Sequence, residues 1–162
     1  MKFRTKWIAA PALLLATLAG CGLGDDDSFQ RDKLTAARAR WESKNLDSYS
    51  YILELQCFCG PSADLRPVLV TVQDGTVASV QYYHENPAQR TPASATIFGP
   101  YDTVDELFEI VEDAIEQDAD VLQVGYDAEY GFPNAVNVDL QAGGSEQVLF
   151  FVTSFTPATT AP

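Results

Sequence analysis

The residue type with the most distinctive chemistry in this chain is cysteine, which occurs three times. Cys57 and Cys59 are separated by a single residue, whereas Cys21 stands apart near the start of the sequence. A thiol can be acylated, oxidised to a disulfide, or used as a nucleophile or a metal ligand. The compartment decides among these fates, because disulfides persist mainly in oxidising environments. The segment before Cys21 indicates which compartment applies.

Residues 1–20 have the pattern of a secretory signal peptide. A positively charged head is followed by an uncharged apolar stretch from Ile8 to Ala19, which is too short to span a membrane comfortably. The stretch ends in Leu-Ala-Gly before Cys21, and this resembles the lipobox of bacterial lipoproteins. The resemblance implies cleavage before Cys21, diacylglycerol on its sulfur and often a further acyl chain, such as palmitate, on its amine. An ordinary signal peptide with an unmodified cysteine and a retained membrane helix are the alternatives.

The charge of the chain limits its partners. The sequence has 10 basic and 23 acidic residues, a net charge of −13. Three of the basic residues lie in the predicted leader, so the mature chain carries 7 against 23, a net charge of −16. A chain this acidic has no electrostatic footprint for nucleic acid. An anionic membrane surface would repel it as well, so we expect the lipid to provide the attachment to the membrane.

If Cys21 is acylated, Cys57 and Cys59 are the two cysteines that remain. An even number of thiols in an oxidising compartment favours a disulfide between them. On a straight strand their Cα atoms would lie about 6.6 Å apart, at the long limit of disulfide geometry, so the chain must bend. Gly60 and Pro61 just downstream allow such a bend. The loop is so small that the chain-entropy model gives at most about 1.6 kcal/mol of stabilisation. A redox-active pair and a zinc site that includes His84 are the alternatives.

Two further places could contact a partner: the end of a predicted hairpin and a turn in the second half of the chain. The candidate residues are Tyr82, Tyr83, His84, Tyr126, Asp127 and Phe132. The first group opens the longest irregular segment, residues 84–100, and long loops in compact domains are often functional or disordered. For the second group the pattern favours a structural corner, in which Gly131 takes an unusual backbone angle and Phe132 packs inward, with a tip that binds a partner as the alternative.

No catalytic motif accompanies these candidates. The sequence lacks G-x-S-x-G, H-E-x-x-H, a glycine-rich phosphate loop and the spacing of an EF-hand. We therefore predict that the protein is not an enzyme, with no catalytic residue, no metal site and no cofactor.

Helices are predicted over 29–44 and 103–117. In the first, Leu34, Ala37 and Trp41 form a narrow apolar stripe. The second has a broader stripe, and Thr103 with Glu106 makes a capping box at its start. Strands are predicted by alternating or continuous apolar residues over 49–58, 68–73, 76–83, 121–126, 135–140 and 147–155.

The clearest hairpin turns at Asp74-Gly75. A three-residue loop pairs Val72 with Ala78, Val70 with Val80 and Val68 with Tyr82, which places the apolar residues on one face. Short links between consecutive strands imply antiparallel pairing. We therefore expect one α+β domain over 29–155 in the order α-βββ-α-βββ, an antiparallel sheet of about six strands with two helices on one face. Residues 21–28 would form a flexible tether and residues 156–162 a disordered tail.

The chain also resembles a family of bacterial lipoproteins that share a domain of unknown function, over about residues 30–155. The resemblance depends on Trp41, Tyr49-Ser50-Tyr51, Cys57-Phe58-Cys59, the hairpin from Val68 to Val80, Val104 to Phe108, and Tyr126-Asp127, Gly131-Phe132-Pro133 and Asp139 in that order. It implies no activity and supplies no catalytic residues. The repeated helix-then-strands order is similar, at the level of the fold alone, to secreted inhibitors that bind a hydrolase with a concave sheet.

These observations predict a lipid-anchored protein of the cell envelope, facing the periplasm or the exterior, with a non-catalytic binding role. The uncovered face of the sheet or the 84–100 loop would contact a protein or peptide partner. Two alternatives remain: an envelope redox helper or small enzyme that uses Cys57 and Cys59, and a hydrolase inhibitor of the secreted type.

Overall fold

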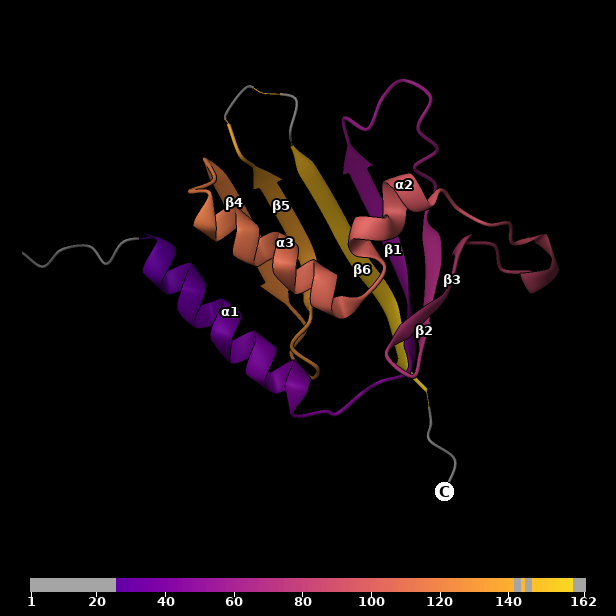
Figure 1. The fold of residues 1–162 in the computed structure, drawn as a ribbon, viewed down its shortest axis with the longest axis horizontal. Helices are drawn as coiled ribbons and strands as arrows, with labels where there is room; N and C mark the ends of the chain where they lie inside the picture. The colour runs from indigo at the N-terminus through magenta and orange to yellow at the C-terminus, as the bar shows by residue number, and fades with distance from the viewer. Residues whose placement is uncertain (1–25, 142–143, 145–146, 159–162) are drawn as a thin grey trace, which may run out of the picture.

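The computed structural model describes residues 26–141, 144 and 147–158 (Figure 1). A six-stranded antiparallel sheet forms one layer and helices form a second, so the α+β class with an antiparallel sheet is confirmed. The elements in chain order are α1 (Asp26–Glu42), β1 (Tyr49–Cys57), β2 (Val68–Gln73), β3 (Thr76–Tyr82), η1 (Pro87–Gln89), α2 (Ala95–Phe98), η2 (Gly99–Tyr101), α3 (Val104–Glu116), β4 (Val121–Tyr126), β5 (Pro133–Asp139) and β6 (Val148–Pro157).

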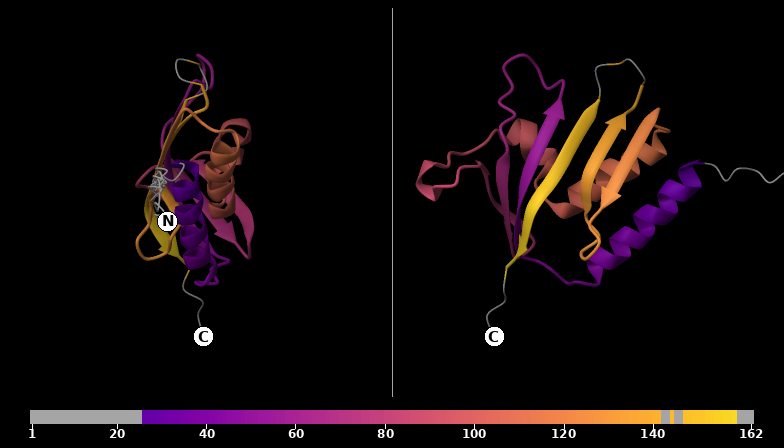
Figure 2. Two further views of the ribbon diagram at one scale, coloured as in Figure 1. Left: turned by 90° about the vertical axis from the view of Figure 1, so that its left-hand side faces the viewer. Right: turned by 180° about the vertical axis from the view of Figure 1, so that it is seen from behind.

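Two three-stranded meanders join to form the sheet, whose spatial order is β3-β2-β1-β6-β5-β4. The seam is the long antiparallel pairing of β1 with β6, from Tyr49 opposite Pro157 to Cys57 opposite Val148. The helices lie on one side of this sheet, and the view from behind shows β1, β6, β5 and β4 with no helix in front of them (Figure 2). One face of the sheet is therefore buried by helices, and the other is open.

The core lies between the sheet and α3. Alternate residues of β1 point into it, and Tyr51 and Leu53 are fully buried. The expected stripe of α3 is buried as well, and its capping box is present: Thr103 accepts a hydrogen bond from the Glu106 backbone N–H, and the Glu106 carboxylate accepts one from the Thr103 N–H. The apolar patterns of the sequence thus identify the buried faces of both elements correctly.

The hairpin between β2 and β3 combines a tighter turn than expected with a bulge. Val68 pairs with Tyr82 and Val70 with Val80, as predicted, but Val72 pairs with Val77 and not with Ala78. The turn has only two residues, Asp74 and Gly75, both with positive φ as a type I′ turn requires. The extra residue is accommodated by a register shift next to Val72, which restores the predicted pairs further along.

The helix count and several boundaries differ from the prediction. A third helix, the single-turn α2, and the 3₁₀ turns η1 and η2 occupy much of the segment expected to be irregular. Phe98 in α2 is fully buried, so this segment contributes to the core. Residues 26–28, expected in the tether, form the first turn of α1, and β6 continues through Thr156 and Pro157, expected in the tail.

The predicted leader, the predicted acylation site Cys21 and residues 22–25 lie outside the described residues, as do residues 159–162 of the predicted tail. In the part of the chain that is described, no helix has the length and apolar character to cross a membrane.

Candidate functional site

The open face of the sheet is built by the outward-pointing residues of the four strands β1, β6, β5 and β4. Strand pairing aligns these residues in rows that run across the sheet. One row is Glu54, Phe151, Ala135 and Gly125, and the next is Gln56, Leu149, Asn137 and Gln123. The inward-pointing residues between them, Val136 and Phe150, belong to the core. The face is therefore a surface of apolar and amide side chains on a rigid support, with the exposed carboxylate of Glu54 on β1 beside Phe151.

A hollow of about 390 Å³ lies on this face near β4. Gly125 and Ala135 form its floor because their side chains are absent or short, and the larger Leu149 and Phe151 stand beside them. None of its lining residues is charged, although the chain has a net charge of −13; they are Gln123, Val124, Gly125, Ala135, Val136, Asn137, Leu149 and Phe151. Water in such a hollow is displaced most readily by an apolar group.

A second hollow of about 410 Å³ adjoins the first, and Leu149 lines both. Its other lining residues are Gln56, Cys57, Phe58 and Gln147, again without charge. The Gln147 side chain donates a hydrogen bond to the Asn137 side chain at 3.1 Å, which links the two hollows by their amides. Together they form one continuous uncharged surface, which we call the amide face.

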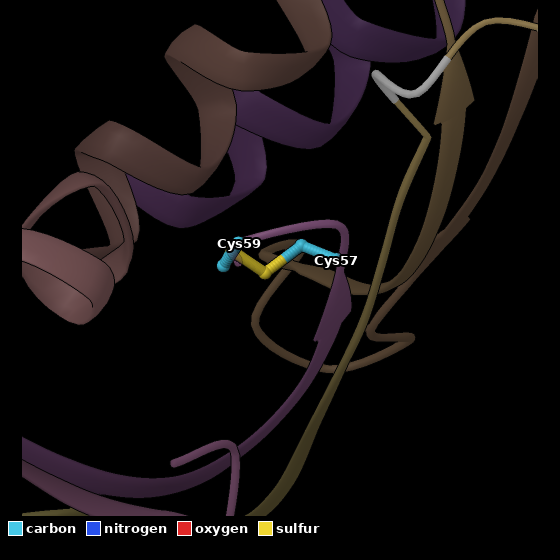
Figure 3. Close-up of a disulfide and its surroundings, with 2 residues drawn as sticks. All are labelled: Cys57 and Cys59. Carbon is cyan, nitrogen blue, oxygen red and sulfur yellow. A yellow bond between two sulfur atoms is a disulfide. The ribbon is translucent and has the colours of Figure 1, made fainter. Parts of the chain in front are cut away.

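Cys57 and Cys59 lie in disulfide contact at the border of the amide face (Figure 3). Their Cα atoms are 5.2 Å apart, closer than on a straight strand, because β1 ends at Cys57 and the chain then bends. Gly60 supports the bend with a φ of +102°, a value that L side chains rarely adopt. Phe58, between the two cysteines, is 72 % exposed.

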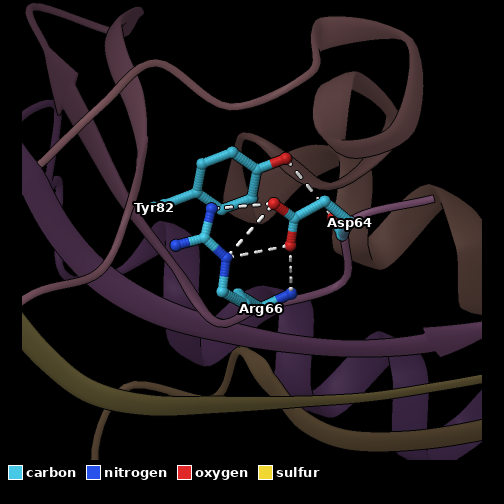
Figure 4. Close-up of polar contacts among 3 residues, drawn as sticks. All are labelled: Asp64, Arg66 and Tyr82. Carbon is cyan, nitrogen blue, oxygen red and sulfur yellow. Dashed lines mark hydrogen bonds and ion pairs between the residues drawn. The ribbon is translucent and has the colours of Figure 1, made fainter. Parts of the chain in front are cut away.

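Tyr82, at the end of the hairpin, fastens the loop between β1 and β2. The Tyr82 hydroxyl donates to the Asp64 carbonyl, and the Arg66 guanidinium lies 4.3 Å from the centre of the Tyr82 ring (Figure 4). Arg66 also pairs with the Asp64 carboxylate at 2.7 Å, and these hydrogen bonds lower the pKa of Asp64.

Tyr83 and His84 lie at the start of the loop that follows β3, apart from the amide face. The His84 Nδ1 accepts a hydrogen bond from the Asn86 N–H at 3.0 Å, and the guanidinium of Arg90 lies 5.7 Å from the centre of the exposed Tyr83 ring. Neither residue lines either hollow of the amide face.

The second predicted binding turn is a structural corner. Asp127 accepts hydrogen bonds from the backbone of Glu129 and Tyr130. Phe132, expected as a contact for a partner, is 2 % exposed and packs against Trp41 and other aromatic rings. The corner is tight because Gly131, with a φ of +90°, lies against the backbone of α1.

Tyr126 ends β4 next to this corner. Its hydroxyl is buried and has no hydrogen-bond partner within the described part of the chain, and burial raises its pKa to about 12. The predicted residues of the two turns thus hold the fold together and do not converge on one site.

An acidic pair lies on the helix side, where η2 leads into α3. Burial, followed by a hydrogen bond with the Glu106 carboxyl and repulsion from it, raises the pKa of Asp102 to about 7. The Glu106 carboxylate accepts backbone hydrogen bonds from Asp102 and Thr103 at 3.1 and 3.2 Å. Beside it, Tyr49 accepts a hydrogen bond from the Val104 N–H, and burial raises the pKa of Tyr49 to about 12.

The uncovered face of the sheet was predicted as a contact surface, but apart from Cys57 none of the residues that line the amide face was named, although one signal in the sequence indicates them. The run Val148 to Val152 is apolar at every position, whereas a strand with one wet face should alternate. Leu149 and Phe151 are therefore apolar residues on the face that no helix covers.

The comparisons with known proteins give one result for family membership. Residues 33–157 match a family of unknown function, DUF6174, which agrees with the extent of the predicted domain of unknown function. A search of curated proteins finds none that matches. Because the match covers well over half of the chain, the protein belongs to the DUF6174 family, a family of unknown function.

Proposed function

We propose that this protein is a lipid-anchored component of the cell envelope that binds another protein, without catalysis, through the amide face. Acylation of Cys21 holds it on the membrane, facing the periplasm or the exterior, and the folded domain presents its open sheet to a partner. The leader pattern and the lipobox resemblance support the anchor. Several acyl chains on one cysteine give stable attachment, since each buried CH₂ contributes about 0.8 kcal/mol.

The observation that carries the binding role is the composition of the amide face. Acidic residues outnumber basic residues by more than two to one in the chain, yet the two hollows are lined by uncharged residues alone. Interface centres are typically depleted in charge and enriched in aromatic residues. Phe58 and Phe151 are among the large apolar side chains that remain exposed in the described part of the chain. A hydrolase bound by a concave sheet would be one partner of this kind.

Photo-cross-linking in the native host tests this role. A photoreactive residue replaces Thr153, which is exposed on β6 two residues beyond Phe151 of the first hollow, in the full-length lipidated protein. The same residue in place of Glu109, exposed on α3, serves as the control position on the helix side. We expect a defined protein adduct from position 153 and none from position 109.

A pair of matched substitutions makes the test specific. Phe151→Asp places a charge in the amide face and should abolish the adduct, whereas Phe29→Asp places the same charge at an exposed ring on α1 and should not. The proposal would be overturned if the adduct from position 153 survives Phe151→Asp. It would also be overturned if position 153 gives no adduct either with or without this substitution. Mass spectrometry of Cys21 tests the anchor separately, because a bare thiol there would contradict it.

The exposed disulfide favours a second candidate, an envelope redox helper. Cys59 is exposed and Cys57 lies at the end of a strand beside the second hollow, so a thiol of another protein can reach the pair. Such a helper would exchange its disulfide for two thiols while a partner dithiol is oxidised. Trapping of a mixed disulfide by Cys57→Ser or Cys59→Ser in the host would support this candidate, and its absence in both variants would argue against it.

A further inference from the structure

The two edges of the sheet differ in how their backbone groups are satisfied. At the β3 edge, the returning loop adds a short bridge: the Tyr82 N–H donates to the Thr91 carbonyl, and the Ala93 N–H donates to the Val80 carbonyl. At the β4 edge, the backbone of Val121–Tyr126 bonds to β5 alone within the described part of the chain. In an antiparallel pair, alternate residues of an edge strand point their N–H and C=O groups away from the neighbouring strand.

The open edge also lacks the features that usually protect such strands. Proteins blunt exposed edges with lysine, proline, charged side chains or a covering segment. The sequence of β4, Val-Leu-Gln-Val-Gly-Tyr, contains no charge and no proline. Its only irregularity is the register shift at Gly125 and Tyr126, at the end of the strand. Helix α1 runs beside β4 (Figures 1 and 2), and no backbone hydrogen bond joins the two within the described part of the chain. The outward backbone groups of β4 are therefore available to pair with another strand.

The first hollow opens onto this same edge. Gly125 lies in β4 itself, and beyond it the floor continues to Ala135 in β5. A strand added to β4 would lie about 4.8 Å away, and its side chains would reach neighbours across the strands. Gly125 has no β-carbon, and the side-chain atoms nearest to that position are the Asn134 Oδ1 at 3.0 Å and the Ala135 β-carbon at 3.4 Å. A ring from the added strand would therefore lie against the Asn134 amide and Ala135 and lean toward Phe151.

We propose that β4 binds an extended peptide segment of the partner by strand addition, with an aromatic side chain of that segment in the hollow above Gly125 and Ala135. The proposal rests on the proposed function, because it specifies what the amide face binds. Main-chain hydrogen bonds to β4 supply affinity, and the uncharged hollow selects the aromatic residue. A lysine-bearing segment suits the strongly acidic chain.

A defined probe tests both parts of the proposal. The probe is the capped peptide Lys-Thr-Val-Thr-Phe-Thr-Val-Thr-Lys. Its threonines alternate with apolar residues, so an extended conformation presents the central phenylalanine ring on one face. Two relatives serve as controls: one with alanine in place of the phenylalanine, and one with its backbone amides N-methylated at alternate positions. Binding to the full-length protein in detergent is measured by fluorescence anisotropy, and amide hydrogen exchange reports on residues 121–126.

Strand addition predicts three results. The probe should slow exchange of the β4 amides, N-methylation should weaken binding by about tenfold or more, and the alanine peptide should bind about tenfold more weakly. Ala135→Leu fills the hollow from β5 and should remove the preference for phenylalanine, whereas Ala78→Leu on the exposed part of β3 should keep it.

Failure of this inference is distinguishable from failure of the proposed function. Equal binding of the N-methylated peptide, unchanged exchange in β4, or no binding of the probe would each overturn strand addition. A cross-link from position 153 in the host would leave the amide face as a binding surface in that case. Loss of the cross-link would remove the proposed function, whatever the peptide does.

Discussion

The acidic pair at the start of α3 makes the stability of the protein depend on pH in a direction opposite to that of a salt-bridged carboxylate. Asp102 is half-buried and shares a hydrogen bond with Glu106, and its pKa is raised from 3.8 to about 7. The native state therefore holds a proton that the unfolded state releases at a lower pH. The stabilisation from this proton is full below about pH 4 and is lost as the pH rises through about 7.

The size of the effect follows from the pKa and from solvent exposure. A rise from 3.8 to about 7 would correspond to about 4 kcal/mol for a group fully shielded from water. Asp102 is partly exposed, so screening by water reduces this figure to about 1–2 kcal/mol. The Asp102→Asn side chain stays neutral at every pH. Relative to the wild type, the free energy of unfolding of this variant should therefore rise by about 1–2 kcal/mol as the pH increases from about 4 to about 8.

Urea unfolding at several pH values, followed by the fluorescence of the buried Trp41, measures this difference. Asp32→Asn removes the same charge from the exposed surface of α1 and controls for the change in net charge. The reasoning fails if the difference between Asp102→Asn and the wild type is the same at both ends of the pH range, or if Asp32→Asn shows an equal trend.

Three further variants test contacts of the fold, each by the free energy of unfolding in urea. Replacing Cys57 and Cys59 together by serine should cost at most about 1.6 kcal/mol, because the loop that they close is tiny. A larger loss would mean that the bond fixes more than its own loop. Tyr51→Phe should cost about 1–3 kcal/mol, because a buried carbonyl loses its 2.6 Å partner; no change would indicate that another donor replaces it. Gly131→Ala should cost about 2 kcal/mol or more, since its φ is +90° and the new methyl would meet the Ala37 carbonyl. A stable variant would show that α1 can move.

The local elements were predictable because each is specified by residues close in sequence. The capping box and broad stripe of α3, the alternation in β1 and the Asp-Gly turn all act within a few residues. The segment containing Phe98 was not predictable in this way. A single helical turn is too short to show a period, so nothing in the local pattern reveals that its phenylalanine enters the core.

The amide face could not be derived from local patterns, because it depends on pairing between distant strands. Gly125, Ala135 and Phe151 become neighbours only when β4, β5 and β6 adopt their register. The sequence showed that Phe151 breaks the expected alternation, but not which short residues would lie beside it. The predicted turns contain more conspicuous residues, such as Phe132, yet those residues are conspicuous because they build a corner.

The central place of β6 ties completion of the fold to a late stage of biosynthesis. Among the strands that the structure describes, β1 and β6 alone pair across the two meanders, and β6 is the last of these strands along the chain. A polypeptide emerges stepwise from a ribosome or through a translocation pore. The backbone N–H and C=O groups on one side of β1 therefore lack their hydrogen-bond partners until residues 148–157 arrive. A nascent chain halted before Val148 would expose the β-edge of each half, where proteases and self-association compete with folding.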